Sequence, residues 1–203
     1  MRRMNRSLNR PMNRRDWLQN LSACGALTLL PTAPAKAAAD LPALLRTGGC
    51  VLMLRHAQTV PGIGDPPNFS LNQCSTQRNL NDEGREQAKL IGQWFKTHGV
   101  QPRSVQTSAW CRCKDTATLA FGHFDLLPAL NSTFDSRNTQ AAQTGGLLER
   151  LTSLRAGQFE VWVTHQVNIT SMTGEVLAMG EAIVVKLGSE NSPGRVLART
   201  SFA

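Results

Sequence analysis

Two histidines, His56 and His165, each stand at the end of a short hydrophobic run, residues 51–55 and 161–164. Short apolar runs rich in β-branched residues are typical of buried parallel strands, and open α/β sheets bind ligands just beyond the carboxyl ends of their strands. Both imidazoles are therefore expected at one edge of one sheet. Because Arg55 directly precedes the first histidine, the pattern predicts a phosphate pocket with a nucleophilic imidazole.

The predicted chemistry is phosphoryl transfer, which needs an in-line nucleophile and cations around the equatorial oxygens. We predict His56 as the nucleophile, because an ordinary imidazole pKa of about 6.5 leaves much of the side chain neutral near pH 7. Arg55 and Arg112 are expected to grip phosphate oxygens, since a planar guanidinium matches two oxygens at once. His165, cationic when phosphate is bound, is expected to stabilise the oxygens from the opposite side.

A second signal supports Arg112, and three further residues have weaker signals for the same pocket. Arg112 stands at the start of an expected helix, where the helix dipole disfavours a cation, and this local conflict favours a functional role. The hydroxyl of Thr59 and the backbone amide of Gln166 are expected to donate to phosphate. Arg78, in the loop before the longest expected helix, is interpreted either as a substrate contact or as a solvated charge.

The elements that must position these residues alternate along the chain. We predict strands at 50–54, 105–108 and 158–164, an edge hairpin at 182–187 and 196–200, and helices at 41–46, 81 or 82 to 98, 112–120, 139–154 and 169–179. Residues 60–79 form a long irregular loop that is expected to be a wall of the site. The predicted fold class is α/β with a mainly parallel sheet.

Four segments together resemble the histidine phosphatase superfamily, which includes phosphoglycerate mutases and phosphohistidine phosphatases. They are Leu54–Thr59, Asn79–Ala88, Thr107–Ala117 and Val163–His165, and in this order and spacing the resemblance covers about residues 50–187. It implies a three-layer α/β/α sandwich and phosphoryl transfer through a phosphohistidine intermediate, without a metal or another cofactor.

The proton donor is where the sequence departs from that family. Members similar to phosphoglycerate mutases carry a glutamate in a Leu-x-Glu segment after the second arginine, and the counterpart here, residues 130–132, reads Leu-Asn-Ser. Another branch has aspartate directly after the second histidine, where this chain has Gln166. Asp135 and Asp65 are the remaining candidates. If neither serves, the leaving group must depart easily without a proton. Mutase activity is disfavoured, because the glycine- and proline-rich loop offers no evident closed lid.

Composition places the chain among globular proteins and argues against nucleic acid as a partner. Of 203 residues, 41% are apolar and 18% charged, which suits one domain with a substantial core. Residues 1–37 hold seven basic residues and one acidic residue, whereas the rest of the chain holds 15 basic and 13 acidic residues. Most of the net charge of +8 therefore belongs to the N-terminal segment and not to the domain.

The basic N-terminal segment, residues 1–39, resembles a cleaved twin-arginine export signal ahead of a catalytic domain at 40–203. Arg14 and Arg15 precede a short apolar stretch, about 21–30, and then a small-residue region, 31–39. A periplasmic or secreted protein without a membrane span in its mature chain is expected, since this stretch is too short to cross a bilayer. A basic tail and a lipoprotein signal at Cys24 are the alternatives.

Export would leave four cysteines in an oxidising compartment: Cys50, Cys74, Cys111 and Cys113. Cys50 begins a buried strand and is expected in the core. Cys74, in a polar loop, could pair with Cys111 or Cys113, and the sequence leaves the pairing open. A zinc site is disfavoured because the Cys-x-Cys pair lacks a matching second pair.

The sequence thus predicts an exported, metal-independent phosphatase that acts on a small phosphomonoester or phosphoramidate. One alternative is a phosphate-ester-binding or signalling module of the same fold without turnover, which the missing donor motivates. Another is a redox or metal-handling protein that uses Cys111 and Cys113.

Overall fold

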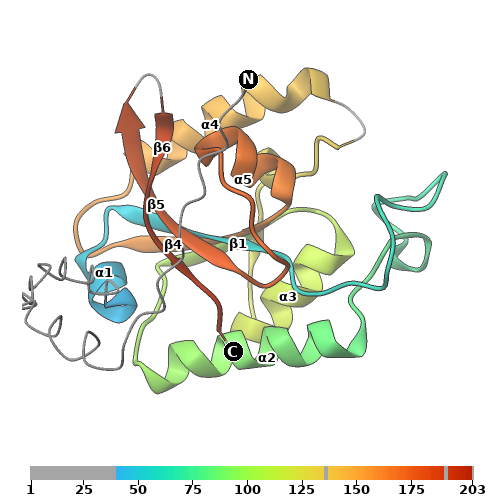
Figure 1. Ribbon diagram of the computed structural model, residues 1–203, viewed down its shortest axis with the longest axis horizontal. Coiled ribbons are helices and arrows are strands. Elements are labelled where there is room, and N and C mark those ends of the chain that lie inside the picture. The colour runs from blue at the N-terminus through green and yellow to red at the C-terminus, as the bar shows by residue number, and fades with distance from the viewer. Residues whose placement is uncertain (1–39, 135–136, 190–191, 203) are drawn as a thin grey trace, which may run out of the picture. The chain divides into compact units, whose positions relative to one another are not determined.

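The computed structural model describes residues 40–134, 137–189 and 192–202 (Figure 1). The predicted export signal and Asp135 lie outside the described residues. The helices are α1 Leu41–Thr47, α2 Asp82–Thr97, α3 Cys111–Phe121, α4 Gln140–Thr152 and α5 Gln166–Thr173, with short 3₁₀ helices at Cys74–Thr76, Pro128–Leu130 and Arg137–Thr139. The strands are β1 Cys50–Arg55, β2 Ser104–Thr107, β3 Asp125–Leu126, β4 Phe159–Thr164, β5 Ala182–Ser189 and β6 Ser192–Thr200.

One six-stranded sheet with the order β3-β2-β4-β1-β5-β6 lies at the centre of the fold. The first four strands in that order pair in parallel, and β5 and β6 add an antiparallel edge. The mainly parallel sheet is therefore confirmed. In the register of β1 and β4, Arg55 pairs with Thr164, so the two strands end side by side. This register brings His56 and His165 to the same edge of the sheet.

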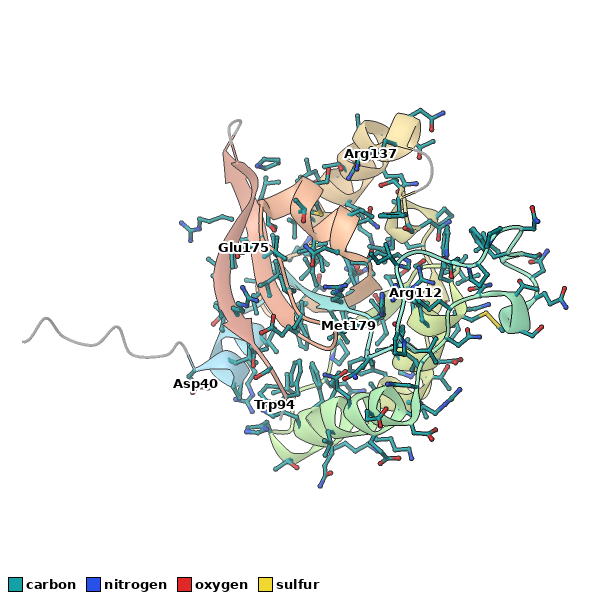
Figure 2. The ribbon with its side chains drawn as sticks, turned by 45° about the vertical axis from the view of Figure 1, so that its right-hand side comes forward. Asp40, Trp94, Arg112, Arg137, Glu175 and Met179 are labelled. Carbon is teal, nitrogen blue, oxygen red and sulfur yellow. A yellow bond between two sulfur atoms is a disulfide. The ribbon has the colours of Figure 1, made fainter. Side chains whose placement is uncertain are left out.

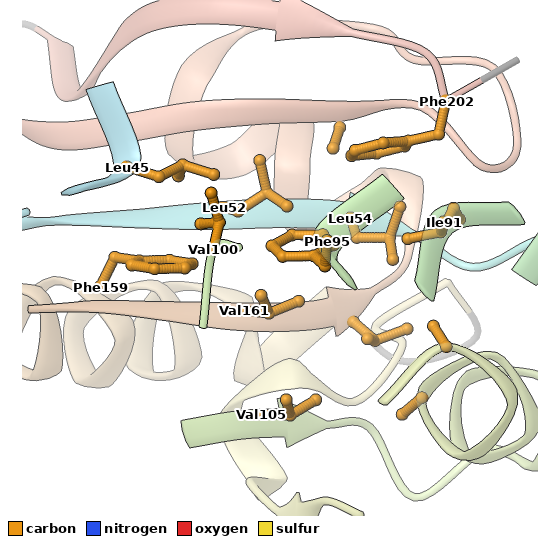
Figure 3. Packing of buried hydrophobic residues seen from close by; sticks show 14 of the residues in the cluster. Leu45, Leu52, Leu54, Ile91, Phe95, Val100, Val105, Phe159, Val161 and Phe202 are labelled. Carbon is orange, nitrogen blue, oxygen red and sulfur yellow. The ribbon is translucent and has the colours of Figure 1, made fainter. Parts of the chain in front are cut away.

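Helices cover both faces of the sheet, which confirms the three-layer sandwich. Because side chains alternate along a strand, β1 sends Leu52 and Leu54 into one core and Met53 into the other. The first core packs against α1, α2 and α3 and includes Phe95 and Val161, which Figure 3 shows beside Leu52 and Leu54. The second packs against α4 and α5, on the opposite face of the sheet in Figure 1.

Two elements differ from the sequence-based prediction. The last helix, expected at 169–179, begins earlier at Gln166 and ends at Thr173, because Gly174 takes a left-handed conformation (φ 76°) and its N–H caps the carbonyl of Thr170. β3 was not predicted, since its two residues are exposed and lack an apolar pattern. Within the described residues, no helix combines the length and hydrophobicity that crossing a membrane requires.

Candidate active site

A cavity of about 320 Å³ lies where β1 and β4 end. Six of its lining residues were predicted as phosphate-handling groups, namely Arg55, His56, Arg78, Arg112, His165 and Gln166. A second cavity, of about 360 Å³, lies between the C-terminal parts of α2 and α3 and contains none of the predicted site residues. Size alone therefore does not identify the candidate site, whereas the convergence of charged groups does.

His56 is held in the state that a nucleophile needs. Its imidazole is 3% exposed, and its Nδ1 lies 2.9 Å from the carbonyl oxygen of Ala57. Because a carbonyl can only accept, Nδ1 carries the proton and Nε2 keeps a free lone pair. Burial, and then the charges of Arg112 and Arg55, lower the pKa of His56 to about 3. The imidazole is therefore neutral near pH 7.

Hydrogen bonds and close packing fix the backbone around His56. The N–H of His56 donates to the carbonyl of Thr164 on β4, and the N–H of Ala57 donates to the hydroxyl of Thr116 on α3. The N-terminus of α2 packs against the backbone just after His56. A Cβ at Gly84 would lie 1.9 Å from the carbonyl oxygen of Gln58. Only glycine permits this approach, which accounts for the glycine in the predicted Asn79–Ala88 motif.

His165 has a fixed proton position as well. Nη2 of Arg112 lies 3.5 Å from its Nδ1, and because a guanidinium only donates, Nδ1 is the acceptor. The N–H at Nε2 then donates to the hydroxyl of Ser108 at 2.8 Å. Burial and the neighbouring charge of Arg112 lower the pKa of His165 well below its usual value, so the imidazole is neutral in this state. A cationic His165 stays a prediction for the phosphate complex.

Arg112 and Asp65 form an ion pair whose side chains are only 4% and 3% exposed. Nη1 of Arg112 donates to Oδ1 of Asp65 at 2.7 Å, and the backbone N–H of Arg78 donates to the same oxygen. The other oxygen, Oδ2, accepts from Nε1 of Trp110 at 2.9 Å. Burial alone would raise the pKa of Asp65, but these hydrogen bonds and the Arg112 charge outweigh it and lower the pKa. Asp65 is therefore an ionised, fully occupied acceptor.

The cavity has a surplus of positive charge with unused donors. Among the described residues, the buried Nε atoms of Arg55, Arg78 and Arg112 have no hydrogen-bond partner. Burial and repulsion from Arg112 lower the pKa of Arg55 and Arg78. Among the described residues that line the cavity, Asp65 is the one carboxylate, and Glu181 outside the lining is a second negative charge that acts on Arg55. Buried donors without partners are rare in native proteins, so this arrangement fits an anionic ligand with several oxygens.

The structure separates the predicted site residues into three groups. Arg55, His56, Arg78, Arg112, His165 and Gln166 line the cavity, and Asp135 lies outside the described residues. Thr59 does not line it, contrary to expectation, because its buried hydroxyl accepts from Nη1 of Arg78 at 2.9 Å. Asp65 lines the cavity, but its lowered pKa and the three hydrogen bonds that it accepts disfavour a role as proton donor, which stays a prediction.

Gln166 contacts the site with its side chain as well as standing at the start of α5. Its Oε1 accepts from the N–H of Leu177 at 2.9 Å and lies 3.5 Å from Nη1 of Arg55. The same Nη1 also donates to the carbonyl oxygen of Leu177. Gln166 and the segment after α5 thus orient Arg55.

A disulfide joins Cys74 to Cys111, one of the two pairings considered for Cys74 (Figure 2). It ties the long loop to the residue beside Arg112, and the N–H of Cys111 donates to the side chain of Gln77 from the same loop. Cys113 is a buried thiol whose pKa burial raises to about 12, and Cys111 is bonded to Cys74, so Cys111 and Cys113 do not form the free pair that the redox or metal-handling alternative requires. The described residues contain no cluster of His, Cys, Asp or Glu suited to a metal.

Sequence reasoning missed Ser108 and Trp110, which hold His165 and Asp65, although both stand inside the quoted Thr107–Ala117 motif. It also missed the uncharged residues of the cavity opening, namely Ile63, Ser132, Phe134, Val167 and Met179. Figure 2 labels Arg112 on α3 and Met179 in the segment before β5, two residues that line the cavity. Only the glycine-rich character of the long loop gave a signal for this opening.

Comparison with known proteins assigns the chain to a family. The family model of the histidine phosphatase superfamily (branch 1) matches residues 51–178. No curated protein sequence matches the chain.

Solved structures agree with the fold. The structure of a candidate alpha-ribazole-5'-P phosphatase from Escherichia coli matches with a TM-score of 0.52 and 15% identity, over 76% of this chain and 97% of that chain. A protein from Thermus thermophilus matches with a TM-score of 0.50 and 21% identity, over 75% and 99%. A candidate phosphohistidine phosphatase SixA from Agrobacterium tumefaciens has a TM-score of 0.49 and 17% identity, over 77% and 99%.

Proposed function

This chain belongs to the histidine phosphatase superfamily, and we propose that it hydrolyses a small phosphomonoester or phosphoramidate through a phosphohistidine intermediate on His56. One observation carries the proposal: a neutral imidazole with a free Nε2 lines the same cavity as three guanidinium groups whose buried Nε atoms have no partner. This combination supplies a nucleophile and cations for the equatorial oxygens of one phosphoryl group.

The proposed reaction has two displacements at phosphorus. In the first, the Nε2 lone pair of His56 forms a P–N bond while the bond to the leaving group breaks, and the leaving group keeps that electron pair. In the second, water forms a P–O bond, the P–N pair returns to Nε2, and inorganic phosphate leaves with the proton lost to solvent. Arg55, Arg78 and Arg112 stabilise the oxygens in both steps, with His165 beside Arg112.

The proposal is tested by turnover and by covalent labelling of the full chain. His56→Ala should abolish phosphate release from an aryl phosphate and remove the acid-labile phosphoryl label, because no other group can form the intermediate. The exposed His123→Ala is the matched control and should keep both signals. Turnover by the His56 variant at the wild-type rate would refute the mechanism.

The Asp65–Arg112 pair gives some support to a second candidate function, a phosphate-ester-binding module without turnover, because a carboxylate already occupies one donor of Arg112. The first turnover separates the two. Release of one equivalent of leaving group, with label on His56, is expected for the phosphatase. Tight binding of a phosphate ester without any release would establish the binding module.

We also propose that the protein acts outside the cytoplasm, in the periplasm or after secretion. The support is the twin-arginine-like segment and the Cys74–Cys111 disulfide, a bond that persists in oxidising compartments. Replacement of Arg14 and Arg15 by lysine should retain the chain, uncleaved, in the cytoplasmic fraction. Unchanged fractionation of that variant would remove the proposal.

A further inference from the structure

The opening of the cavity is formed by uncharged side chains from separate segments, and we call Ile63, Ser132, Phe134, Val167 and Met179 the mouth. Ile63 is 91% exposed and Phe134 is 49% exposed. Single exposed apolar residues are common, but here two large ones border the same cavity. The mouth therefore offers an exposed apolar surface in the same cavity as Arg55, Arg78 and Arg112, and we call these three arginines the arginine floor.

The two exposed residues belong to segments that approach each other closely. A Cβ at Gly64, which has φ +72°, would lie 3.5 Å from Cε1 of Phe134, so the chain beside Ile63 passes over the Phe134 ring. All formal charges of the described lining residues belong to Arg55, Arg78, Arg112 and Asp65, and none belongs to the mouth. Among the described residues, a second charged group of a ligand would therefore find no partner in the mouth, whereas an apolar ring would be partly removed from water there.

The chemistry of the leaving group points the same way. Asp65 is the sole carboxylate among the described lining residues, and it accepts from Arg112, from the N–H of Arg78 and from Trp110. Its lowered pKa leaves it ionised near pH 7, and Asp135, the other candidate donor, lies outside the described residues. An alkoxide departs poorly without a general acid, whose contribution is typically about 10² to 10⁴-fold in rate, whereas an aryloxide departs without one.

We propose that the substrate is an aryl phosphate whose ring lies in the mouth between Ile63 and Phe134 while its phosphoryl group lies on the arginine floor. This inference rests on the proposed function and narrows it to one class of ester. The P–O bond to the ring breaks as Nε2 of His56 attacks, the phenolate takes the electron pair, and water then supplies its proton.

Ring binding is tested separately from turnover, with non-hydrolysable phosphonates and calorimetry on the full chain. Phenylphosphonate should bind about tenfold more tightly than ethylphosphonate, because only the phenyl group reaches the mouth. Phe134→Ala and Ile63→Ala should each lower that ratio towards one, and Leu187→Ala, which removes an exposed side chain on β5 outside the mouth, should not. Equal affinities for the two phosphonates in the wild type would overturn the inference.

Leaving-group dependence is tested with three esters. Phenyl phosphate should have a kcat/KM at least about 10²-fold above benzyl phosphate, which carries the ring but leaves as an alkoxide, with ethyl phosphate lowest of the three. Equal values for phenyl and benzyl phosphate, with His56 phosphorylated by both, would overturn this inference and leave the proposed function standing. Failure of all three esters and of a phosphoramidate to phosphorylate His56 would instead refute the proposed function, and this inference with it.

Discussion

Two arginine–carboxylate pairs in this molecule look alike in distance but differ in how much of the guanidinium they use. Arg150, on α4, donates from Nε and Nη2 to the two oxygens of Glu160 on β4, at 2.7 and 3.0 Å. Arg112 gives Asp65 only Nη1, also at 2.7 Å, and its buried Nε has no partner. The first pair consumes the two-point edge of its arginine. The second leaves Nε without a partner and places Nη2 3.5 Å from Nδ1 of His165.

The carboxylates are satisfied in both regions, so the difference lies with the cations. Glu160 also accepts from Nε1 of Trp162 at 2.8 Å, much as Asp65 accepts from Nε1 of Trp110. In each case burial would raise the carboxyl pKa, and hydrogen bonds outweigh it and lower the pKa. A carboxylate can thus neutralise an arginine fork or only orient it. The incomplete pair marks the region where an anion is to bind.

The largest effect expected from this comparison is that of Arg112→Lys. Lysine keeps the charge but loses the two-point grip, so kcat/KM should fall by about 10² to 10³-fold. Arg150→Lys is the matched control, and it should keep kcat/KM within about twofold while lowering the free energy of unfolding by about 1 kcal/mol. Steady-state kinetics and urea denaturation measure both. Wild-type kinetics for Arg112→Lys would show that both pairs are structural.

Replacement of Asp65 sharpens the comparison, because it shows whether Asp65 orients Arg112 or donates a proton to the leaving group. Asp65→Asn should raise KM by about tenfold for phenyl and ethyl phosphate alike, since a less firmly held guanidinium binds any phosphoryl group less well. Glu160→Gln should destabilise the fold by about 2 kcal/mol and leave KM unchanged. A loss confined to the alkyl ester would instead restore Asp65 as the general acid.

Much of the scaffold could be predicted because it follows from local patterns. The apolar runs before His56 and His165 fix two parallel strands, and parallel strands that end together place both histidines at one edge. The boundaries of α5 could not be read in this way, since Gly174 acts as a helix stop only in its left-handed conformation. β3 could not be predicted because its strand conformation depends on pairing with β2 and not on a pattern in its own sequence.

The cavity residues at the ends of strands and the starts of helices could be predicted from the sequence. Those in the long loop could not. Asp65 meets Arg112 across 47 residues, and no periodicity relates a loop carboxylate to a helix start. The loop contacts depend on the Cys74–Cys111 bond and on Gln77, which are set by tertiary packing. Sequence reasoning therefore predicted the cations of the cavity but not the ion pair that Asp65 makes with one of them.

The smallest predicted effect concerns pH, and it tests whether the cavity has the uncompensated positive charge that the Arg150 region lacks. The pKa of His56 is about 3 in the folded chain, lowered by burial and by Arg112 and Arg55, against about 6.5 when exposed. Below pH 6.5 the unfolded chain therefore binds a proton that the folded chain does not. Stability from this group is present above pH 6.5 and is lost as the pH falls towards 3.

His56→Asn removes this linkage and keeps an amide that can donate to Ala57. Between pH 7.5 and 5.5 the free energy of unfolding of the wild type should fall by about 1.4 kcal/mol more than that of the variant. The exposed His123→Asn should follow the wild type, because water surrounds its imidazole before and after unfolding. Urea denaturation at the two pH values measures all three. If His56→Asn loses as much stability as the wild type, the pKa of His56 is not lowered in the folded chain. The surplus positive charge of the cavity would then be compensated, as it is around Arg150.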